Sequence, residues 1–194
     1  MDGVPLDALV SRILAASPFV YRVADDHERA IAYRLRAEVV LERGWLGAAD
    51  LPDRLERDEY DERAVHVIGW DGAVPMSTGR VVLPPGLPTE KACGLVVDPQ
   101  GEVVDVGRMC VARTHQDLEH SAFIGLMCRL YQVMRMEGYV VACGMMTGRA
   151  QVLVRHLGLR LETLGPPRSY WNEERTPVRF SLLANLETVR VGPS

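Results

Sequence analysis

Residues 102–111 read Glu102-Val-Val-Asp-Val-Gly-Arg-Met-Cys-Val111, an apolar stretch that carries an acidic and a basic side chain in its middle. Its β-branched residues predict a buried strand. Burying an unpaired carboxylate or guanidinium costs several kcal/mol, so Asp105 and Arg108 are expected either to pair with each other or to line a cleft. Gly107 lies between them and can host a β-bulge that re-aims one of the two side chains. The stretch therefore predicts a distorted central strand beside a cleft, with a structural Asp–Arg pair as the alternative.

Composition places the chain among ordinary globular proteins. Its 194 residues fit one domain, and 47% hydrophobic with 25% charged residues is typical of a protein with a packed core. No apolar run approaches the roughly 20 residues that cross a bilayer, so no membrane partner is expected. A net charge of −4 and a pI near 5.8 argue against binding to nucleic acid.

The cysteines and the start of the chain predict a cytoplasmic protein. Residues 1–5, Met1-Asp-Gly-Val-Pro5, lack the basic region and cleavage pattern of a secretion signal. Cysteines without a Cys-x-x-Cys pair are interpreted as reduced thiols, so neither a metal site nor a disulfide framework is expected. These cysteines are Cys93, Cys110, Cys128 and Cys143.

Hydrophobic periodicity predicts one mixed α/β (α+β) domain over 19–194, preceded by a helical extension over 1–18. Asp71-Gly72 is the strongest hairpin signal, and the long loop over 44–60 is expected to be a lid or binding element. Residues 83–101, which are rich in proline, are expected to be irregular. Helices are predicted over 6–16, 27–43, about 123–138 and 148–157, and strands over 19–23, 65–70, 74–82, 103–111, 139–145, 159–164 and 178–183.

Four motifs stand in order within residues 19–183: Leu35-Arg36 with Arg43-Gly-Trp45, then Asp58-Glu-Tyr-Asp61, then Thr78-Gly-Arg80, and finally Asp105-Val-Gly-Arg108. The order of elements resembles the GNAT N-acyltransferase fold, and the four motifs are similar to one branch of it. That branch contains the acyl-homoserine-lactone (autoinducer) synthases and the N-acyl amino acid synthases. The fourth motif has Asp where that branch has Glu.

The resemblance implies a central sheet that is splayed between its fourth and fifth strands, flanked by helices, where a thioester arm meets an amine. It makes Asp105 the first choice for the base that takes the proton of the amine, with Glu102 in reserve and Arg108 beside them; a structural role for Asp105 stays open. The implied substrate-binding residues are Arg36, Trp45, Asp58, Asp61, Arg80, Met109, Cys110, Val111 and Cys143.

Alternatives remain for several of these residues. The arginines at 36, 80 and 108 either receive the carboxylate of an amino-acid-like acceptor or hold the carboxylates Asp58 and Asp61, at the end of the lid and next to it. Trp45 anchors the lid or stacks on substrate. The amides of residues 109–111 are expected to bind the thioester carbonyl and pantetheine, while Cys110 and Cys143 are expected to pack in the core and not to accept an acyl group.

Two departures from the family pattern bear on the substrates. Superfamily members that use acetyl-CoA carry a glycine-rich loop for the pyrophosphate, whereas residues 113–122 have no glycine and two acids. An acyl-carrier protein is therefore the expected donor, with acyl-CoA as the alternative and no tightly bound cofactor. Val39-Val40 stands where autoinducer synthases usually carry Phe, which weakens a specific claim for S-adenosylmethionine. The expected acceptor is a small amine or amino-acid-like molecule, with S-adenosylmethionine as one possibility. A non-catalytic acyl-thioester binding module is the remaining alternative.

Overall fold

The protein is built around one mixed sheet. The computed structural model describes residues 6–156 and 159–181, and its eight strands follow the order β1-β2-β3-β4-β5-β8-β6, with β7 paired to β8. Most neighbours are antiparallel, and β4 with β5 is parallel. The helices are α1 Leu6–Ala16, α2 Arg29–Glu42, α3 Pro88–Cys93, α4 Glu119–Met136 and α5 Gly148–His156. The strands are β1 Val20–Val23, β2 Ala64–Asp71, β3 Val74–Val82, β4 Val103–Val111, β5 Val141–Met146, β6 Glu162–Thr163, β7 Arg168–Tyr170 and β8 Glu173–Ser181.

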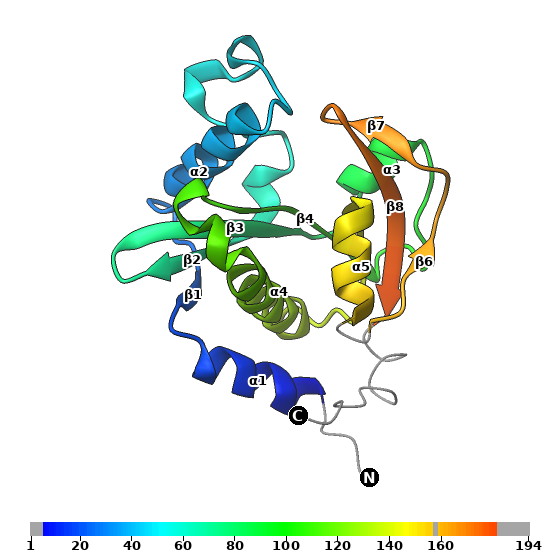
Figure 1. Ribbon diagram of the computed structural model, residues 1–194. Helices are drawn as coiled ribbons and strands as arrows, with labels where there is room; N and C mark the ends of the chain where they lie inside the picture. The colour runs from blue at the N-terminus through cyan, green and yellow to red at the C-terminus, as the bar shows by residue number, and fades with distance from the viewer. Residues whose placement is uncertain (1–5, 157–158, 182–194) are drawn as a thin grey trace.

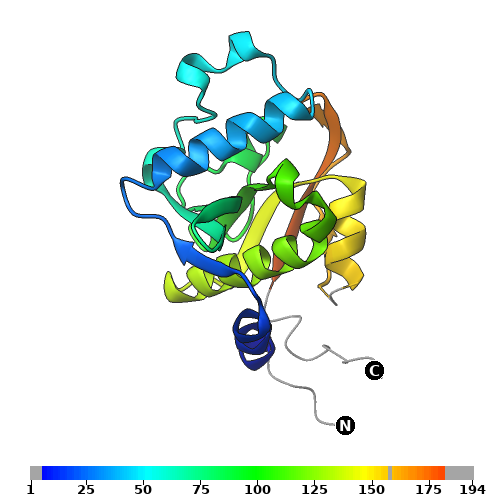
Figure 2. The same cartoon turned by 60° about the vertical axis from the view of Figure 1, so that its left-hand side comes forward.

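The helices cover the sheet unequally. Helix α2 lies on one face and α4 on the other (Figures 1 and 2). Helix α4 turns its apolar side chains, spaced three and four residues apart, into the main core, and α1 packs against α4. On the opposite face, Ala32 of α2 packs with Ile68 of β2. The mixed sheet flanked by helices, predicted from periodicity, is confirmed.

The sheet is splayed between β4 and β5. The two strands pair only from Val103 with Val141 to Asp105 with Cys143, although β4 continues to Val111 and β5 to Met146. Gly144 lies at the point of divergence, where a Cβ atom would stand 2.6 Å from the carbonyl oxygen of Val106. The predicted separation of the fourth and fifth strands is therefore present.

A bulge distorts β4 beside this opening. Thr78 of β3 pairs with Cys110 and Arg80 pairs with Gly107, so Gly79 alone faces two residues of β4. One of the two, Arg108, has φ 54, in the left-handed region that side chains rarely adopt. The bulge was expected from the glycine at 107, but the arginine next to it takes the strained conformation.

The structure also corrects several element boundaries. Helix α3 occupies part of the stretch expected to be irregular, and the strand predicted over 159–164 contracts to β6. The last strand begins at Glu173, not at 178, because it forms a hairpin with β7. Both central residues of its turn, Trp171 and Asn172, have positive φ, as in a type I′ turn. Residues 182 and 183 of the predicted strand lie outside the described residues.

Candidate active site

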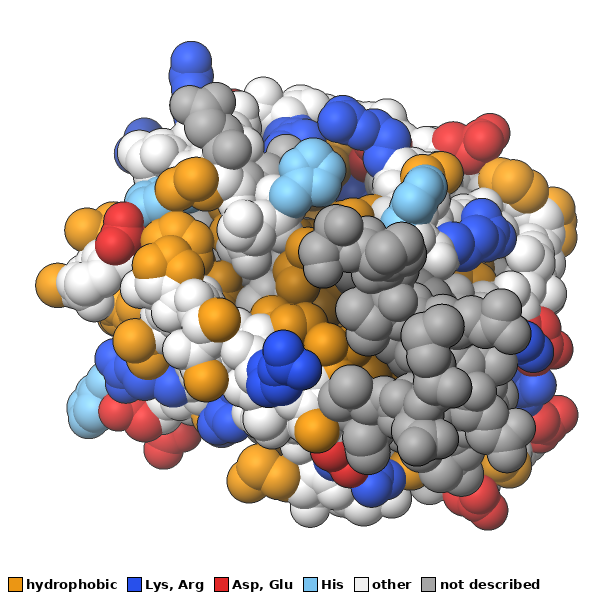
Figure 3. All heavy atoms as spheres, turned by 60° about the horizontal axis from the view of Figure 1, so that its bottom comes forward, with side chains coloured by type: hydrophobic (Ala, Val, Ile, Leu, Met, Phe, Trp, Pro, Cys, Tyr) orange, Lys and Arg blue, Asp and Glu red, His pale blue; other side chains and the backbone are white. Residues whose placement is uncertain are grey.

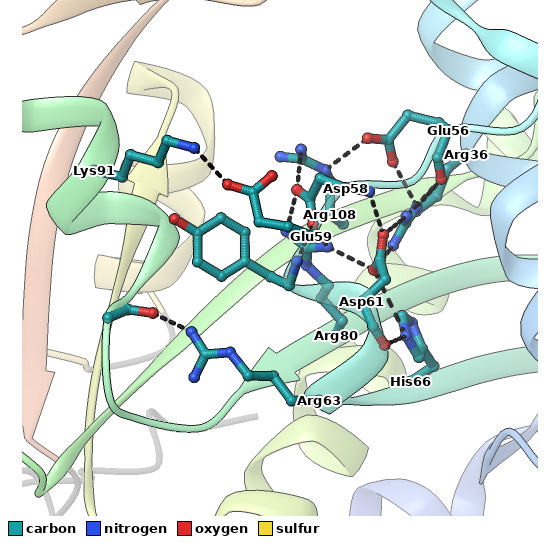
Figure 4. A network of polar contacts seen from close by, with 12 residues as sticks. Arg36, Glu56, Asp58, Glu59, Asp61, Arg63, His66, Arg80, Lys91 and Arg108 are labelled. Atoms are coloured by element: carbon teal, nitrogen blue, oxygen red, sulfur yellow. Dashed lines mark hydrogen bonds and ion pairs between the residues drawn. The ribbon is translucent and has the colours of Figure 1, made fainter.

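Three arginines and three carboxylates form a buried network between α2, the lid and the sheet (Figure 4). Arg36 comes from α2, Arg80 from β3 and Arg108 from the bulge of β4, whereas the carboxylates all come from the chain between α2 and β2. The guanidiniums of Arg36 and Arg80 are almost inaccessible. The carboxylates are Glu56, Asp58 and Asp61.

Asp61 is the centre of the network. It accepts hydrogen bonds from Arg36 at 2.9 and 2.7 Å, from Arg80 at 2.5 Å and from the amide of Asp58 at 2.8 Å. Burial alone would raise the pKa of Asp61, but the guanidiniums of Arg36 and Arg80 outweigh it and hold that pKa well below its usual range. Asp61 is therefore ionised at every pH at which the protein is ordinarily handled.

Arg80 ties the lid to the sheet. Its Nη1 and Nη2 atoms donate to the two oxygens of Asp58 at 2.6 and 2.7 Å. Burial favours a lower pKa for Arg80, yet the carboxylates of Asp58 and Asp61 raise it. Since Arg36 also donates to the carbonyl of Glu56, the arginines hold the lid in place, which is one of the two roles expected for them.

Arg108 joins this network to the β7–β8 hairpin. Its Nε donates to Glu56 at 3.1 Å, its Nη2 to Asp58 at 2.8 Å and its Nη1 to the hydroxyl of Tyr170 at 3.0 Å. The guanidinium also stacks on Trp171, with Cζ 3.9 Å from the ring centroid. The strained backbone at Arg108 is therefore compensated by contacts to two separate parts of the fold.

His66 closes the network on the β2 side without carrying charge. Its Nε2 lies 3.2 Å from the carbonyl oxygen of Asp61, and burial lowers the pKa of His66 to about 4. The imidazole is thus neutral at pH 7, and its side chain is 1% exposed. His66 is therefore a neutral core residue and is not placed to act as a base.

A cavity of about 370 Å³ runs from this network through the gap between β4 and β5 to the other face of the sheet. On the α2 side its wall is polar and aromatic, with Arg36, Trp45 and Trp171. On the α4 side the wall is apolar, and hydrophobic side chains gather at the centre of that face in Figure 3. The apolar wall includes Leu6, Leu9, Val10, Ile13, Phe123, Met127, Leu130 and Leu153.

The gap between these halves is bordered by β4 itself. The whole run from Val106 to Val111 lines the cavity, including the predicted binding positions Met109, Cys110 and Val111. Burial raises the pKa of the Cys110 thiol to about 12, so Cys110 is not a nucleophile at neutral pH. Trp45 packs against the cluster of Val40 and Leu51, as expected for a lid anchor, and it also lines the cavity, where stacking on substrate stays a prediction.

Asp105 lies behind the gap, not on the cavity wall. Its Oδ2 accepts a hydrogen bond from the amide of Thr89 at 2.8 Å and from the thiol of Cys143 at 3.7 Å. Burial raises the pKa of Asp105. The predicted pair with Arg108 is absent from the described contacts, because each side chain has other partners. Its Oδ1 lies 3.5 Å from where a Cβ of Gly107 would stand.

Two other predicted residues are not at the cavity. Glu102 is exposed in the turn before β4, so the structure separates it from the gap and removes it as a reserve base. Cys143 is fully buried beside Asp105 and packs with Leu87, Val97 and Val103, away from the cavity. Burial and the carboxyl of Asp105 raise the pKa of the Cys143 thiol far above its ordinary value. Neither the position of Glu102 just before a strand nor the apolar run around Cys143 indicates in the sequence which way these side chains point.

Four further cavity or network residues escaped the sequence analysis. Glu56 bridges Arg36 and Arg108 from the lid, with no motif to single it out. The other three lie in the β7–β8 hairpin, where Asn172, a residue type that favours turns, is the signal in the sequence that marks their position. They are Tyr170, Trp171 and Arg175.

Within residues 6–156 and 159–181, no group of three or more His, Cys, Asp or Glu side chains is arranged to hold a metal ion. None of the helices in this part of the chain combines the length and apolarity needed to cross a bilayer.

Comparison with known proteins identifies the fold. No family model and no curated protein sequence matches the chain. Among solved structures, the AHL synthase LasI superposes with a TM-score of 0.73 at 16% identity, over 92% of this chain and 100% of that one. The CoA-dependent acyl-homoserine lactone synthase BjaI, determined with SAM and isopentyl-CoA, gives 0.65 at 20% identity, over 81% and 77%.

The resemblance extends to FeeM, an N-acyl amino acid synthase from uncultured soil microbes, with a TM-score of 0.61 at 16% identity over 84% of this chain and 90% of that one. At these identities the comparison establishes the fold. The fold expected from the four motifs, that of autoinducer and N-acyl amino acid synthases, is therefore confirmed.

Proposed function

We propose that the protein is an N-acyltransferase that moves an acyl group from a phosphopantetheine thioester to the amine of a small, amino-acid-like acceptor. The observation that carries this proposal is the single cavity that crosses the sheet through the gap between β4 and β5. One half is charged and aromatic and the other is apolar, so an acceptor and an acyl chain can meet from opposite faces.

The apolar half suits the acyl chain. Its side chains come from α1, α4 and α5, and four methionines, Met127, Met134, Met145 and Met146, line it with flexible thioethers that pack irregular alkyl groups well. The thioester arm would lie in the gap, where amides of β4 between Met109 and Val111 that face away from β3 are available to its carbonyl.

The nitrogen of the acceptor loses two protons as a C–N bond replaces the C–S bond. The acceptor arrives as an ammonium ion and gives its first proton to a base; the free amine attacks the thioester carbonyl carbon, the C–N bond forms, the C–S bond breaks, and the leaving pantetheine thiolate takes up the second proton that the nitrogen loses. We assign the first proton to Asp105, whose raised pKa suits a base. Because Gly107 has no side chain, a water molecule beside it would connect Asp105 with the gap.

An acyl-carrier protein is the donor we favour. The segment η4 Arg113–Leu118, before α4, takes the place of a pyrophosphate-binding loop and has no glycine whose amides could approach a diphosphate. Acyl-CoA is the second candidate, since BjaI and MesI are described as CoA-dependent synthases on the same fold. S-adenosylmethionine stays among the acceptors to be tested, because BjaI was determined with it.

The proposal is tested by measuring amide formation with mass spectrometry, using acyl-carrier-protein thioesters and acyl-CoA thioesters of several chain lengths. Asp105→Asn keeps an oxygen that can accept from Thr89, so it should fold and lose at least about a hundredfold in rate. The matched control is Asp26→Asn, at a carboxylate that is 88% exposed. Absence of turnover with every donor would leave an acyl-thioester binding module, and an unchanged Asp105→Asn rate would remove that base.

A further inference from the structure

The β7–β8 hairpin builds one wall of the acceptor half of the cavity. Tyr170 and Trp171 stack with centroids 5.7 Å apart and an interplanar angle of 6°, and Trp171 lies 6.3 Å from Trp45 of the lid. Asn172 donates a hydrogen bond to the carbonyl of Gly44, which fixes the turn of the hairpin to the end of α2. The wall therefore joins the hairpin to residues at the end of α2 that are distant in sequence.

Arg175 projects from β8 into this aromatic group. Its Cζ lies 4.6 Å from the centroid of Trp45 and 5.8 Å from those of Trp171 and Tyr170. The rings orient the guanidinium but do not satisfy its hydrogen bonds. Its side chain is 13% exposed, and its Nε is buried without a hydrogen-bond partner in the described residues. Such an orphaned donor beside a cavity is a ready position for an oxygen ligand.

The balance of charge makes that ligand an anion. The described wall of the cavity carries five arginines and a single carboxylate, Glu173. Arg36 and Arg108 are neutralised by the three carboxylates of the lid. Arg175, in contrast, has one contact of 3.2 Å from Nη2 to Glu173 as its described ion pair. Burial lowers the pKa of Arg175, but a guanidinium still carries its charge at pH 7. Glu173 therefore balances the positive charge of Arg175 only in part.

We propose that Arg175 binds the carboxylate of the acceptor, and that the acceptor is an α-amino acid with its carboxylate free. The carboxylate would accept from the part of the Arg175 guanidinium that lines the cavity, while Trp45 and Trp171 enclose the rest of the molecule. Trp171 also stacks on Arg108 of the β4 bulge, so this position adjoins the gap. Because a single carbon separates the amine from the carboxylate of an α-amino acid, the amine is directed toward the thioester. This inference deepens the proposed function and rests on it for the direction of the amine.

The test measures binding separately from turnover. The standard protein amino acids are screened one at a time as probes by isothermal titration calorimetry on the full chain, and the best ligand is compared with its carboxamide. The carboxamide keeps the amine and the side chain but removes the negative charge. We expect the acid to bind at least about tenfold more tightly than its carboxamide. Equal binding of the two, or no binding of any amino acid, would overturn the proposal.

Variants locate the effect at Arg175. Arg175→Gln should weaken the acid about tenfold and leave the carboxamide unchanged, and Arg175→Lys should retain part of the preference. Arg168→Gln is the matched control, since Arg168 pairs with Arg175 across the hairpin but is exposed and is not a cavity residue. An Arg175→Gln variant that folds and keeps the full preference for the acid would refute the assignment.

The two proposals fail in different ways. If the protein binds an amino acid through Arg175 but transfers no acyl group from any thioester, the carboxylate site stands and the transferase proposal fails. If acyl transfer occurs equally well to an amino acid and to its carboxamide, the transferase proposal stands and the carboxylate site fails. If Arg175→Gln does not fold, the comparison of acid and carboxamide on the unmodified protein still decides.

Discussion

Replacing Asp61 with Asn tests whether the lid is held by charge. Asp61 is 3% exposed and accepts four described hydrogen bonds, three of them from guanidiniums. The side-chain amide of Asn has only one acceptor oxygen. Its NH2 group would face N–H donors of the arginines, with which it cannot form a hydrogen bond. The substitution also leaves three buried arginines facing two carboxylates.

The cost follows from this imbalance. Removing one partner of a buried ion pair costs about 3–5 kcal/mol, because the remaining charge stays desolvated and unpaired. That is a large fraction of the roughly 5–15 kcal/mol by which a domain is ordinarily stable. Since the pKa of Asp61 is held below its usual value, its contribution is present above about pH 4 and is lost as the pH falls further.

Urea denaturation at pH 7, followed by circular dichroism, measures the free energy of unfolding of Asp61→Asn. The control is Asp53→Asn, the same chemical change at a lid carboxylate that is 77% exposed and 3.7 Å from Arg57. Asn tolerates the positive φ of Asp53, so we expect a loss below about 0.5 kcal/mol there. Equal losses in the two variants would show that the buried charges are not coupled as their geometry indicates.

Three further predictions concern the core, the gap and the acyl end of the cavity. His66 should make the protein less stable as the pH falls from about 6.5 to 4, by up to about 3 kcal/mol, because the unfolded chain takes up the proton first; in His66→Gln this part of the pH dependence should vanish from urea titrations. Gly144→Ala should cost about 1–3 kcal/mol by the same assay, as its Cβ would lie 2.6 Å from the carbonyl oxygen of Val106, whereas Gly148→Ala, with open space around it, should be neutral. Leu9→Trp should shift the preferred acyl thioester toward shorter chains in competition assays, and an unchanged preference would remove α1 from the acyl site.

The sequence predicted those features that local chemistry determines. The hairpin signal Asp71-Gly72 lies where β2 ends, the two turn residues are Gly72 and Ala73, and β2 and β3 pair across them as expected. The acid and the base in an otherwise apolar strand predicted a distorted β4, because desolvation forbids an undistorted, solvent-free position for both. The order of the elements then predicted the sheet, which depends on connection lengths and handedness more than on single residues.

The remaining features depend on partners that lie far away in sequence. Arg36 is buried although helical periodicity alone gives a charged residue no reason to be, since its partners are Glu56 and Asp61 in the lid. Likewise, Asp105 faces Thr89 of α3, in a stretch expected to be irregular. The alternation of side chains along β4 predicts two faces but does not say which element covers each face. The sequence of β4 alone therefore could not predict the contact of Asp105 with Thr89.

The bulge of β4 connects two parts of the candidate site: the gap between β4 and β5, and the wall that the β7–β8 hairpin forms on the acceptor side of the cavity, called the acceptor wall below. A glycine would take the left-handed conformation without strain, and Gly107 is adjacent, yet Arg108 takes it. That conformation costs about 1–2 kcal/mol, and the contacts of its guanidinium to Asp58 and Tyr170 offset it. The left-handed conformation of Arg108 therefore directs a cation between the lid and the β7–β8 hairpin, beside the gap where β4 and β5 no longer pair. Any change that releases this guanidinium should relax the bulge, so the gap and the acceptor wall are expected to form and to fail together.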